Sequence, residues 1–294
     1  MSTRQIDQLI QGMPTADGAG VKLVRTLGSR GDATRVDPFL MLDEFSSTNA
    51  DDYSAGFPDH PHRGFETVTY MLAGHMLHED HMGNRGDLLP GMVQWMTAGR
   101  GVIHSEMPQQ SEGRMHGFQL WLNLPARDKL KPARYRDIAA DEIPTAELTD
   151  GGRVRVIAGQ LQLSGRSLSG PINPSGTDLP TEPLYLDIEL PAGARFEQAL
   201  SPEHNAFIYV FEGSARVGEV DVAQQHVGRL GAGNRLVVDG GEQGARMLLL
   251  AGRPLNEPIV QHGPFVMNSR AEIEQAVQDY TNGTLTQATT DSPA

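Results

Sequence analysis

The segment TVTYMLAG at residues 67–74 combines β-branched, aromatic and aliphatic residues and ends in glycine, which is typical of a buried strand followed by a turn. The segment AFIYVFEG at residues 206–213 has the same character in the other half of the chain. Further short apolar segments lie between turn residues, at 21–24, 117–124, 154–158, 184–190, 236–238 and 247–251. Because strands and helices do not alternate, the pattern predicts an all-β protein of the antiparallel sandwich or barrel type.

The two halves of the chain look like diverged copies of one unit. Besides the two strand segments, Leu89–Gly91 falls about where Leu230–Gly233 falls. A length of 294 residues accommodates two barrels. The stretch 125–152 contains prolines among charged residues, which indicates a connection between domains rather than a strand. We therefore expect an N-terminal barrel over residues 1–135 and a C-terminal barrel over residues 136–283.

One helix is expected near the C-terminus. Ser269 and Glu272 have the spacing of a capping box, and the apolar residues between 273 and 280 keep helical spacing. This pattern predicts a helix at about residues 269–281, which we assign to the C-terminal barrel. Residues 284–294 are mostly polar, so we expect them to form a disordered tail.

Composition excludes several classes of function. The chain has no cysteine, so disulfides, thiolate metal sites and cysteine nucleophiles are ruled out. The net charge is −13 and only three lysines are present, which disfavours nucleic-acid binding. We find no signal-peptide pattern and no apolar run long enough to span a bilayer, and we expect a cytoplasmic protein without membrane contact.

Histidines concentrate in the first half of the chain, where two short motifs have the spacing of metal ligands. His60 and His62 are two residues apart, so on a strand both imidazoles face the same side. His104 and Glu106 repeat this spacing with a carboxylate. Two such pairs on neighbouring strands supply four ligands and leave two positions of an octahedral ion open. Pairs of this kind also occur on solvated loops, so the spacing alone leaves both interpretations open.

Longer motifs around these residues resemble those of the pirin family, which belongs to the cupin superfamily. In chain order they read HPHRGFETVTY at 60–70, QWMTAGRGVIHSEMP at 94–108, HGFQLWLN at 116–123 and QHGPFVMN at 261–268. The resemblance therefore extends over nearly the whole chain up to the tail.

The resemblance implies two stacked cupin (jelly-roll) β-barrels with one metal ion, in the N-terminal barrel only. The family's four ligands match His60, His62, His104 and Glu106 of this sequence. Iron, as Fe(II), is the metal that the resemblance favours. Three histidines and a glutamate also suit nickel, copper, manganese, cobalt or zinc.

Glu66 is a second carboxylate near the motif. It occupies the position that binds metal in many other cupins, and it shares strand parity with His62 if the strand stays regular through Arg63–Gly64. The pirin pattern instead uses Glu106, so we expect Glu66 to orient a ligand imidazole. The candidates for the wall of a pocket are Arg63, Phe65, Trp95, Met96, Phe118 and Trp121. Ordinary core packing is the other interpretation for Trp95, Phe118 and Trp121. Arg63 and Phe65 face the opposite side of the strand from the ligands if the strand is regular, which argues against a role in the pocket.

The remaining histidines are interpreted as structural or solvated. In the cluster HMLHEDH at 75–81, the first and last histidines face one side of a strand and the middle one faces the other. In the second half, Ala199 and Ser201 correspond to His60 and His62 by their distance from the strand-closing glycine. The C-terminal barrel is therefore predicted to bind no metal.

The resemblance implies an enzyme with quercetin 2,3-dioxygenase activity, which opens a flavonol ring with dioxygen and releases carbon monoxide. Two open coordination positions suit a flavonol or another small aromatic enol together with dioxygen. Glu106 is the predicted catalytic residue, since a carboxylate can accept the proton of the substrate hydroxyl. The alternative is an iron-dependent regulatory protein that acts by binding a protein partner.

Overall fold

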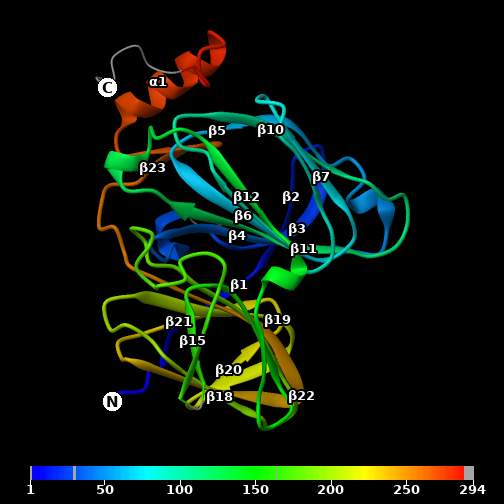
Figure 1. Ribbon diagram of the computed structural model, residues 1–294, viewed down its shortest axis with the longest axis vertical. Coiled ribbons are helices and arrows are strands. Elements are labelled where there is room, and N and C mark those ends of the chain that lie inside the picture. Colours follow the sequence, from blue (N-terminus) through cyan, green and yellow to red (C-terminus); the bar gives the residue numbers. More distant parts are fainter. Residues whose placement is uncertain (1, 29–30, 164, 288–294) are drawn as a thin grey trace. The chain divides into compact units, whose positions relative to one another are not determined.

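The computed structural model describes residues 2–28, 31–163 and 165–287 and consists mostly of β-strands (Figure 1). The predicted all-β class is confirmed. In the described part of the chain the α-helical residues form one element, α1 (Arg270–Thr281). That part contains no helix long and apolar enough to cross a membrane.

The strands form three larger sheets and two hairpins. The seven-stranded sheet runs in the order β12 (Arg134–Ile138), β9 (Val93–Thr97), β6 (Phe65–Ala73), β11 (Met115–Asn123), β4 (Phe39–Ser47), β3 (Val21–Leu27) and β2 (Met13–Asp17). The four-stranded sheet runs in the order β5 (Phe57–His62), β10 (Val102–Pro108), β7 (Met76–Asp80) and β8 (Arg85–Leu88).

The nine-stranded sheet comes mainly from the second half of the chain. Its order is β1 (Ile6–Gln11), β21 (His226–Leu230), β19 (Asn205–Val217), β22 (Arg235–Gly252), β17 (Leu184–Leu190), β14 (Arg153–Ala158) and β13 (Thr145–Glu147), with β18 (Arg195–Ala199) on β22 and β20 (Val220–Ala223) on β19. The hairpins are β15 (Gln160–Leu163) with β16 (Arg166–Ser169) and β23 (Val260–His262) with β24 (Phe265–Met267). Short 3₁₀ helices are η1 (Gly31–Thr34), η2 (Ala50–Asp52), η3 (Ala126–Asp128) and η4 (Ala140–Glu142).

The register of the strands shows the internal repeat directly. The segment around Tyr70 forms the central strand β6, which pairs with β9 and β11. The segment around Tyr209 forms β19, which pairs with β21 and β22. Tyr70 lies opposite Val93, and Tyr209 lies opposite Val227, so β9 and β21 occupy equivalent places. The predicted equivalence of Leu89–Gly91 and Leu230–Gly233 is therefore wrong, because the first precedes β9 whereas the second begins at the end of β21.

The described residues divide into two compact units that interleave along the chain. Unit 1 takes its residues from 1–15, 23–44 and 138–255, and unit 2 takes its residues from 16–22, 45–137 and 256–294. The transition at residue 137 lies inside the predicted connection 125–152. That connection is not free of strands, since it contains β12 and β13 as the end strands of their sheets. Proline-containing segments are tolerated at such edges, where one side of the strand needs no hydrogen bonds.

Both ends of the chain depart from the predicted division at residue 135. The N-terminal strand β1 pairs with β21 in unit 1. The buried guanidinium of Arg4 holds this segment by donating to the carbonyls of Gly233, Ser201 and His204. Strands β1 and β21 lie far apart in the sequence, and such pairing leaves no local pattern. The predicted boundary at residue 135 therefore assigned β1 to the N-terminal barrel.

The C-terminal helix belongs to unit 2, not to the C-terminal barrel. Its N-cap is Ser269, as predicted, and its side chain accepts a hydrogen bond from the backbone N–H of Glu272. Ile273 and Ala276 are buried with residues of β24, and Arg63 donates to Asp279 at 2.7 Å. Burial also continues beyond the helix, because Leu285, at the start of the predicted tail, is 1 % exposed. The rest of that tail, residues 288–294, lies outside the described residues.

Lys129 anchors the turn that follows His62. Lys129 is 1 % exposed, and its ammonium group donates to the Gly64 carbonyl, to Asn123 Oδ1 and to the Val266 carbonyl at 2.7, 2.7 and 3.0 Å. Burial lowers the pKa of Lys129 to about 8. The side chain thus joins three separate segments of unit 2 close to the histidine motif.

We expect Lys129→Met to lower the free energy of unfolding by about 1–3 kcal/mol, because it leaves three buried oxygen acceptors unpaired. Denaturant unfolding followed by circular dichroism measures this loss. Lys22→Met is the control, since Lys22 is exposed and pairs with Asp52 at the surface, where such pairs contribute little. Equal stabilities of the two variants would contradict the anchoring role of Lys129.

Candidate metal centre

The candidate centre is built on the pairing of β5 with β10 in the four-stranded sheet of unit 2. His104 lies directly opposite His60, and Val102 lies opposite His62. The register shifts between His104 and Glu106, so that Glu106 lies opposite Phe57. The extra residue of this bulge lies in β5, between Phe57 and His60, whereas β10 pairs regularly with β7, so Glu106 keeps the same face of β10 as His104.

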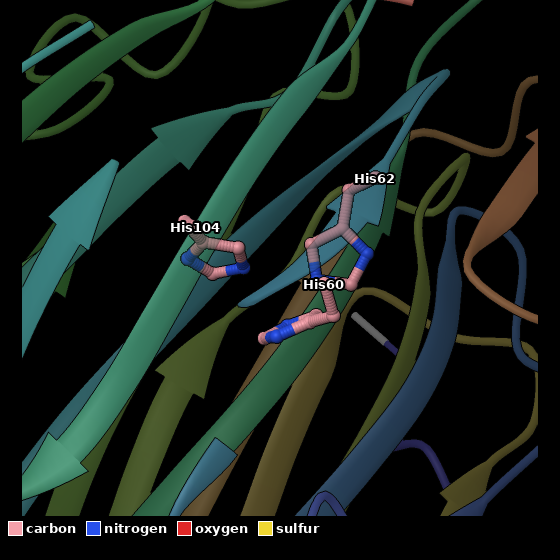
Figure 2. Close-up of side chains that lie close together, drawn as sticks. All are labelled: His60, His62 and His104. Carbon is pink, nitrogen blue, oxygen red and sulfur yellow. The ribbon is translucent and has the colours of Figure 1, made fainter. Parts of the chain in front are cut away.

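Three imidazoles converge across these two strands (Figure 2). The ligand nitrogens of His60, His62 and His104 all lie within 4.8 Å of one another. His62 and His104 are buried, whereas His60 is half-buried. The structure thus brings together the three histidines that the sequence predicted, and a group of three such side chains can hold one metal ion.

The ring nitrogens of this cluster fit a metal ion. Nδ1 of His62 and Nε2 of His104 are buried and have no hydrogen-bond partner among the described residues. Nδ1 of His60 lies 2.8 Å from the Pro58 carbonyl, to which it donates, so that Nε2 of His60 keeps its lone pair. Buried polar atoms without partners are costly in a protein interior, and a bound cation removes that cost.

Electrostatics keep two of these rings neutral. Burial lowers the pKa of His62 well below its usual value, and the neighbouring His60 lowers it further. Burial and then the neighbouring imidazoles act in the same direction on the pKa of His104. Neutral imidazole is the form that binds a metal, so these two ligands need not lose a proton when a metal binds near neutral pH.

Glu106 is buried next to the cluster but is not one of the three converging ligands. Its side chain reaches the facing strands β6 and β11. Oε1 lies 3.0 Å from the hydroxyl of Thr69, and Oε2 accepts from the Gln119 amide at 3.3 Å. The sequence reasoning missed Thr69 and Gln119, because nothing in their local sequence shows that they face Glu106.

Glu66 has a different role from the one expected. Strand β5 ends at His62 and β6 begins at Phe65, so Arg63–Gly64 is a corner between two sheets and parity does not carry across it. Gly64 has a φ of 91°, a conformation that suits glycine. Glu66 accepts from Trp95 Nε1 at 3.1 Å and from the Thr97 hydroxyl at 2.7 Å, and it lies 3.6 Å from Lys131 Nζ. Among the described residues it makes no hydrogen bond to an imidazole.

Aromatic side chains border the cluster on the side of His62. The ring of His62 lies 5.1 Å from Phe65 and 5.3 Å from Trp121, and these two aromatic rings are 4.3 Å apart. The other pocket candidates have other surroundings. Trp95 is bonded to Glu66, and Phe118 packs against Tyr70 in the core.

The cluster at residues 75–81 is only partly solvated. The side chain of His75 is 35 % exposed and pairs with Asp87, and His81 is exposed. His78, by contrast, is 1 % exposed, and its Nδ1 lies 3.2 Å from Nδ1 of His104. As predicted, His78 faces the opposite side of the strand from His75 and His81. That side is the protein interior.

Unit 1 has no histidine at the places that correspond to His60, His62 and His104 of unit 2. If Val227 is aligned with Val93, the same number of residues leads to Val238 in unit 1 as to His104 in unit 2. Val238 lies opposite Phe196, as His104 lies opposite His60. The predicted equivalence with Ala199 and Ser201 is therefore wrong, because Phe196 rather than Ala199 takes the place of His60. Gln198 stands at the place of His62, and valine and phenylalanine offer no ligand atoms, so the three-histidine set of unit 2 is not repeated here.

The lowered pKa values predict how the metal-free protein responds to acid. A neutral, buried His62 or His104 gains its proton on unfolding, so below about pH 6.5 the unfolded chain binds more protons and the free energy of unfolding falls. Thermal unfolding between pH 7.5 and pH 5.5 should show this loss in the wild type, with a flatter profile in the His62→Gln/His104→Gln double variant. His262→Gln, at an exposed position, is the control. Parallel profiles for wild type and double variant would refute the assignment.

Comparison with known proteins identifies the family. Residues 20–122 match the model of Pirin, and residues 185–286 match that of the Pirin C-terminal cupin domain. A protein of Pseudomonas aeruginosa provisionally named quercetin 2,3-dioxygenase is 54 % identical, over 96 % of this chain and 98 % of its own length.

Solved structures agree with this result. The crystal structure of quercetin 2,3-dioxygenase from Acinetobacter baumannii matches with a TM-score of 0.86 and 32 % identity, over 97 % of this chain and 99 % of that one. A bacterial pirin of Escherichia coli in complex with nickel(II) shares the fold, with a TM-score of 0.61 and 18 % identity over 84 % of this chain and 98 % of that one. Sequence and structure therefore agree over nearly the full length, and the chain belongs to the pirin family.

Proposed function

We propose that this protein is a metal-dependent dioxygenase that opens the central ring of a flavonol-like enol, as in the quercetin 2,3-dioxygenase reaction. The observation that carries the proposal is the convergence of three imidazoles, two of which have unpaired, buried ring nitrogens. The names of the Pseudomonas and Acinetobacter relatives support the substrate class.

The proposed cofactor is one divalent metal ion, with iron as the first choice. His60, His62 and His104 would hold it, with Glu106 as the fourth ligand. Nickel, copper, manganese, cobalt and zinc are the alternatives, and nickel(II) is the ion bound by the E. coli pirin. Such an ion would supply a Lewis acid that stabilises the oxyanion of the substrate.

The protein's own side chains would bind the substrate and manage its proton. Phe65 and Trp121 present aromatic surface beside His62, against which a flat aromatic substrate can pack. Glu106 is a carboxylate inside the protein and can accept the proton of the enol hydroxyl. Hydrogen bonds from the Gln119 amide and the Thr69 hydroxyl hold that carboxylate in place.

We expect His104→Ala to lose its metal, because the variant removes one of the three converging ligands. Elemental analysis of the purified protein, reconstituted with each metal in turn, measures the occupancy. Glu106→Gln and Glu66→Gln form a matched pair that tests the carboxylate ligand. Weaker binding in Glu106→Gln alone supports the proposed set, whereas weaker binding in Glu66→Gln alone would transfer the role to Glu66.

The activity is tested by following quercetin absorbance, dioxygen uptake and carbon monoxide release together. Metal-loaded wild type should consume the flavonol and release carbon monoxide, and His62→Ala should lose this turnover while it still unfolds cooperatively. His226→Ala, in unit 1, is the control expected to keep full activity.

Carbon monoxide no higher than in free-metal controls, across iron, nickel, cobalt, copper and manganese, would overturn the dioxygenase proposal. The alternative would then be a regulatory protein whose binding to a protein partner depends on iron. A partner whose affinity changes with the oxidation state of the iron would support that alternative.

A further inference from the structure

His78 is a buried histidine outside the proposed ligand set, and its contacts suggest a specific task. It lies on β7, the neighbour of β10 in the four-stranded sheet, directly opposite Glu106. Its backbone position therefore directs the side chain to the same interior face as Glu106 and His104. The rings of His78 and His104 lie 4.8 Å apart, with 3.2 Å between their Nδ1 atoms.

This contact restricts how the two rings can share their protons. A neutral imidazole carries one N–H, so of two facing Nδ1 atoms one donates and the other accepts. In the first arrangement His104 donates from Nδ1 and its Nε2 holds a lone pair. In the second, His78 donates from Nδ1 and the proton of His104 is on Nε2. Only the first leaves His104 able to bind a metal through Nε2, its unpaired buried nitrogen.

The surroundings of the two rings favour the first arrangement. In the first arrangement the single N–H of His78 is on Nε2. The carboxylates of Glu106, Asp80 and Asp137 act electrostatically on that ring. The opposite arrangement leaves an N–H on Nε2 of His104, whose electrostatic neighbours are the imidazoles of His60, His62 and His78. A polar N–H is better placed near negative charge.

We propose that His78 is a positioning residue, which accepts the Nδ1–H of His104 and so fixes the tautomer and ring orientation in which Nε2 of His104 faces the metal position. This inference rests on the metal centre of the proposed function and adds a residue to it. Metal-binding histidines commonly donate their second nitrogen to a carboxylate, a carbonyl or water, and here an imidazole would take that place.

The proton positions can be measured in the wild-type protein without metal. Long-range ¹H–¹⁵N correlation spectra of histidine-labelled protein at neutral pH distinguish the two tautomers, and His104→Gln and His78→Asn assign the signals. We expect the proton of His104 on Nδ1 and that of His78 on Nε2. A His104 signal protonated on Nε2 would overturn the proposal, and this result needs no variant of uncertain stability.

Metal affinity provides the second test, with competition against a chromogenic chelator as the measurement. His78→Leu removes the acceptor, and His78→Asn retains an oxygen acceptor near the place of Nδ1. We expect His78→Leu to bind metal about 10–100-fold more weakly than wild type, the usual effect of losing such a partner, and His78→Asn to recover most of that affinity. His75→Leu, at a partly exposed position on the same segment, is the control that should bind like wild type.

Wild-type affinity in His78→Leu, or equal weakening in the Leu and Asn variants, would overturn the positioning role. Thermal unfolding of each variant shows whether a loss reflects misfolding, and in that case the wild-type spectrum decides. None of these measurements requires flavonol turnover, so failure of the dioxygenase assay and failure of this proposal remain distinguishable.

Discussion

The antiparallel register of β5 and β10 is the constraint on which the candidate centre depends. Because His60 lies opposite His104, two motifs separated by more than forty residues in sequence present their imidazoles to one point. A shift of one residue would turn one motif to the other face of the sheet and separate the ligands. Glu106 shares the face of His104 on β10, and its carboxylate reaches β6 and β11, where Thr69 and Gln119 bind it.

A corner between two sheets keeps that register in place. Directly after His62 the chain turns at Arg63–Gly64, and buried cations hold both residues of the turn. Lys129 binds the Gly64 carbonyl, and Arg63 binds the Arg100 carbonyl, Asp279 and the Leu285 carbonyl. The C-terminal segment is therefore part of the unit that carries the histidines, and it supports the end of the strand that bears two of them.

The interior around the histidines is polar, and most of its groups have defined partners. The carboxylate of Glu66 accepts hydrogen bonds from Trp95 and Thr97 and pairs with Lys131. Three of the buried side-chain nitrogens without hydrogen-bond partners among the described residues lie together, on the imidazoles of His62, His78 and His104. Such unpaired atoms are uncommon in protein interiors, and their gathering at one place is what a metal centre requires.

The sequence by itself determined the central apolar strands, the start of the helix at Ser269 and the three histidines, because these depend on local periodicity, capping and short motifs. Only the tertiary structure decided which groups surround them. The alternation of side chains along a strand placed Glu66 on the same face as His62, but a corner between two sheets separates them. His78 was interpreted as solvated or structural, and in the structure it contacts His104. The N-terminal strand β1 belongs to unit 1 and the C-terminal helix α1 to unit 2, although their positions in the sequence indicated the opposite. These outcomes depend on long-range pairing, which leaves no local signal because each partner lies far away along the chain.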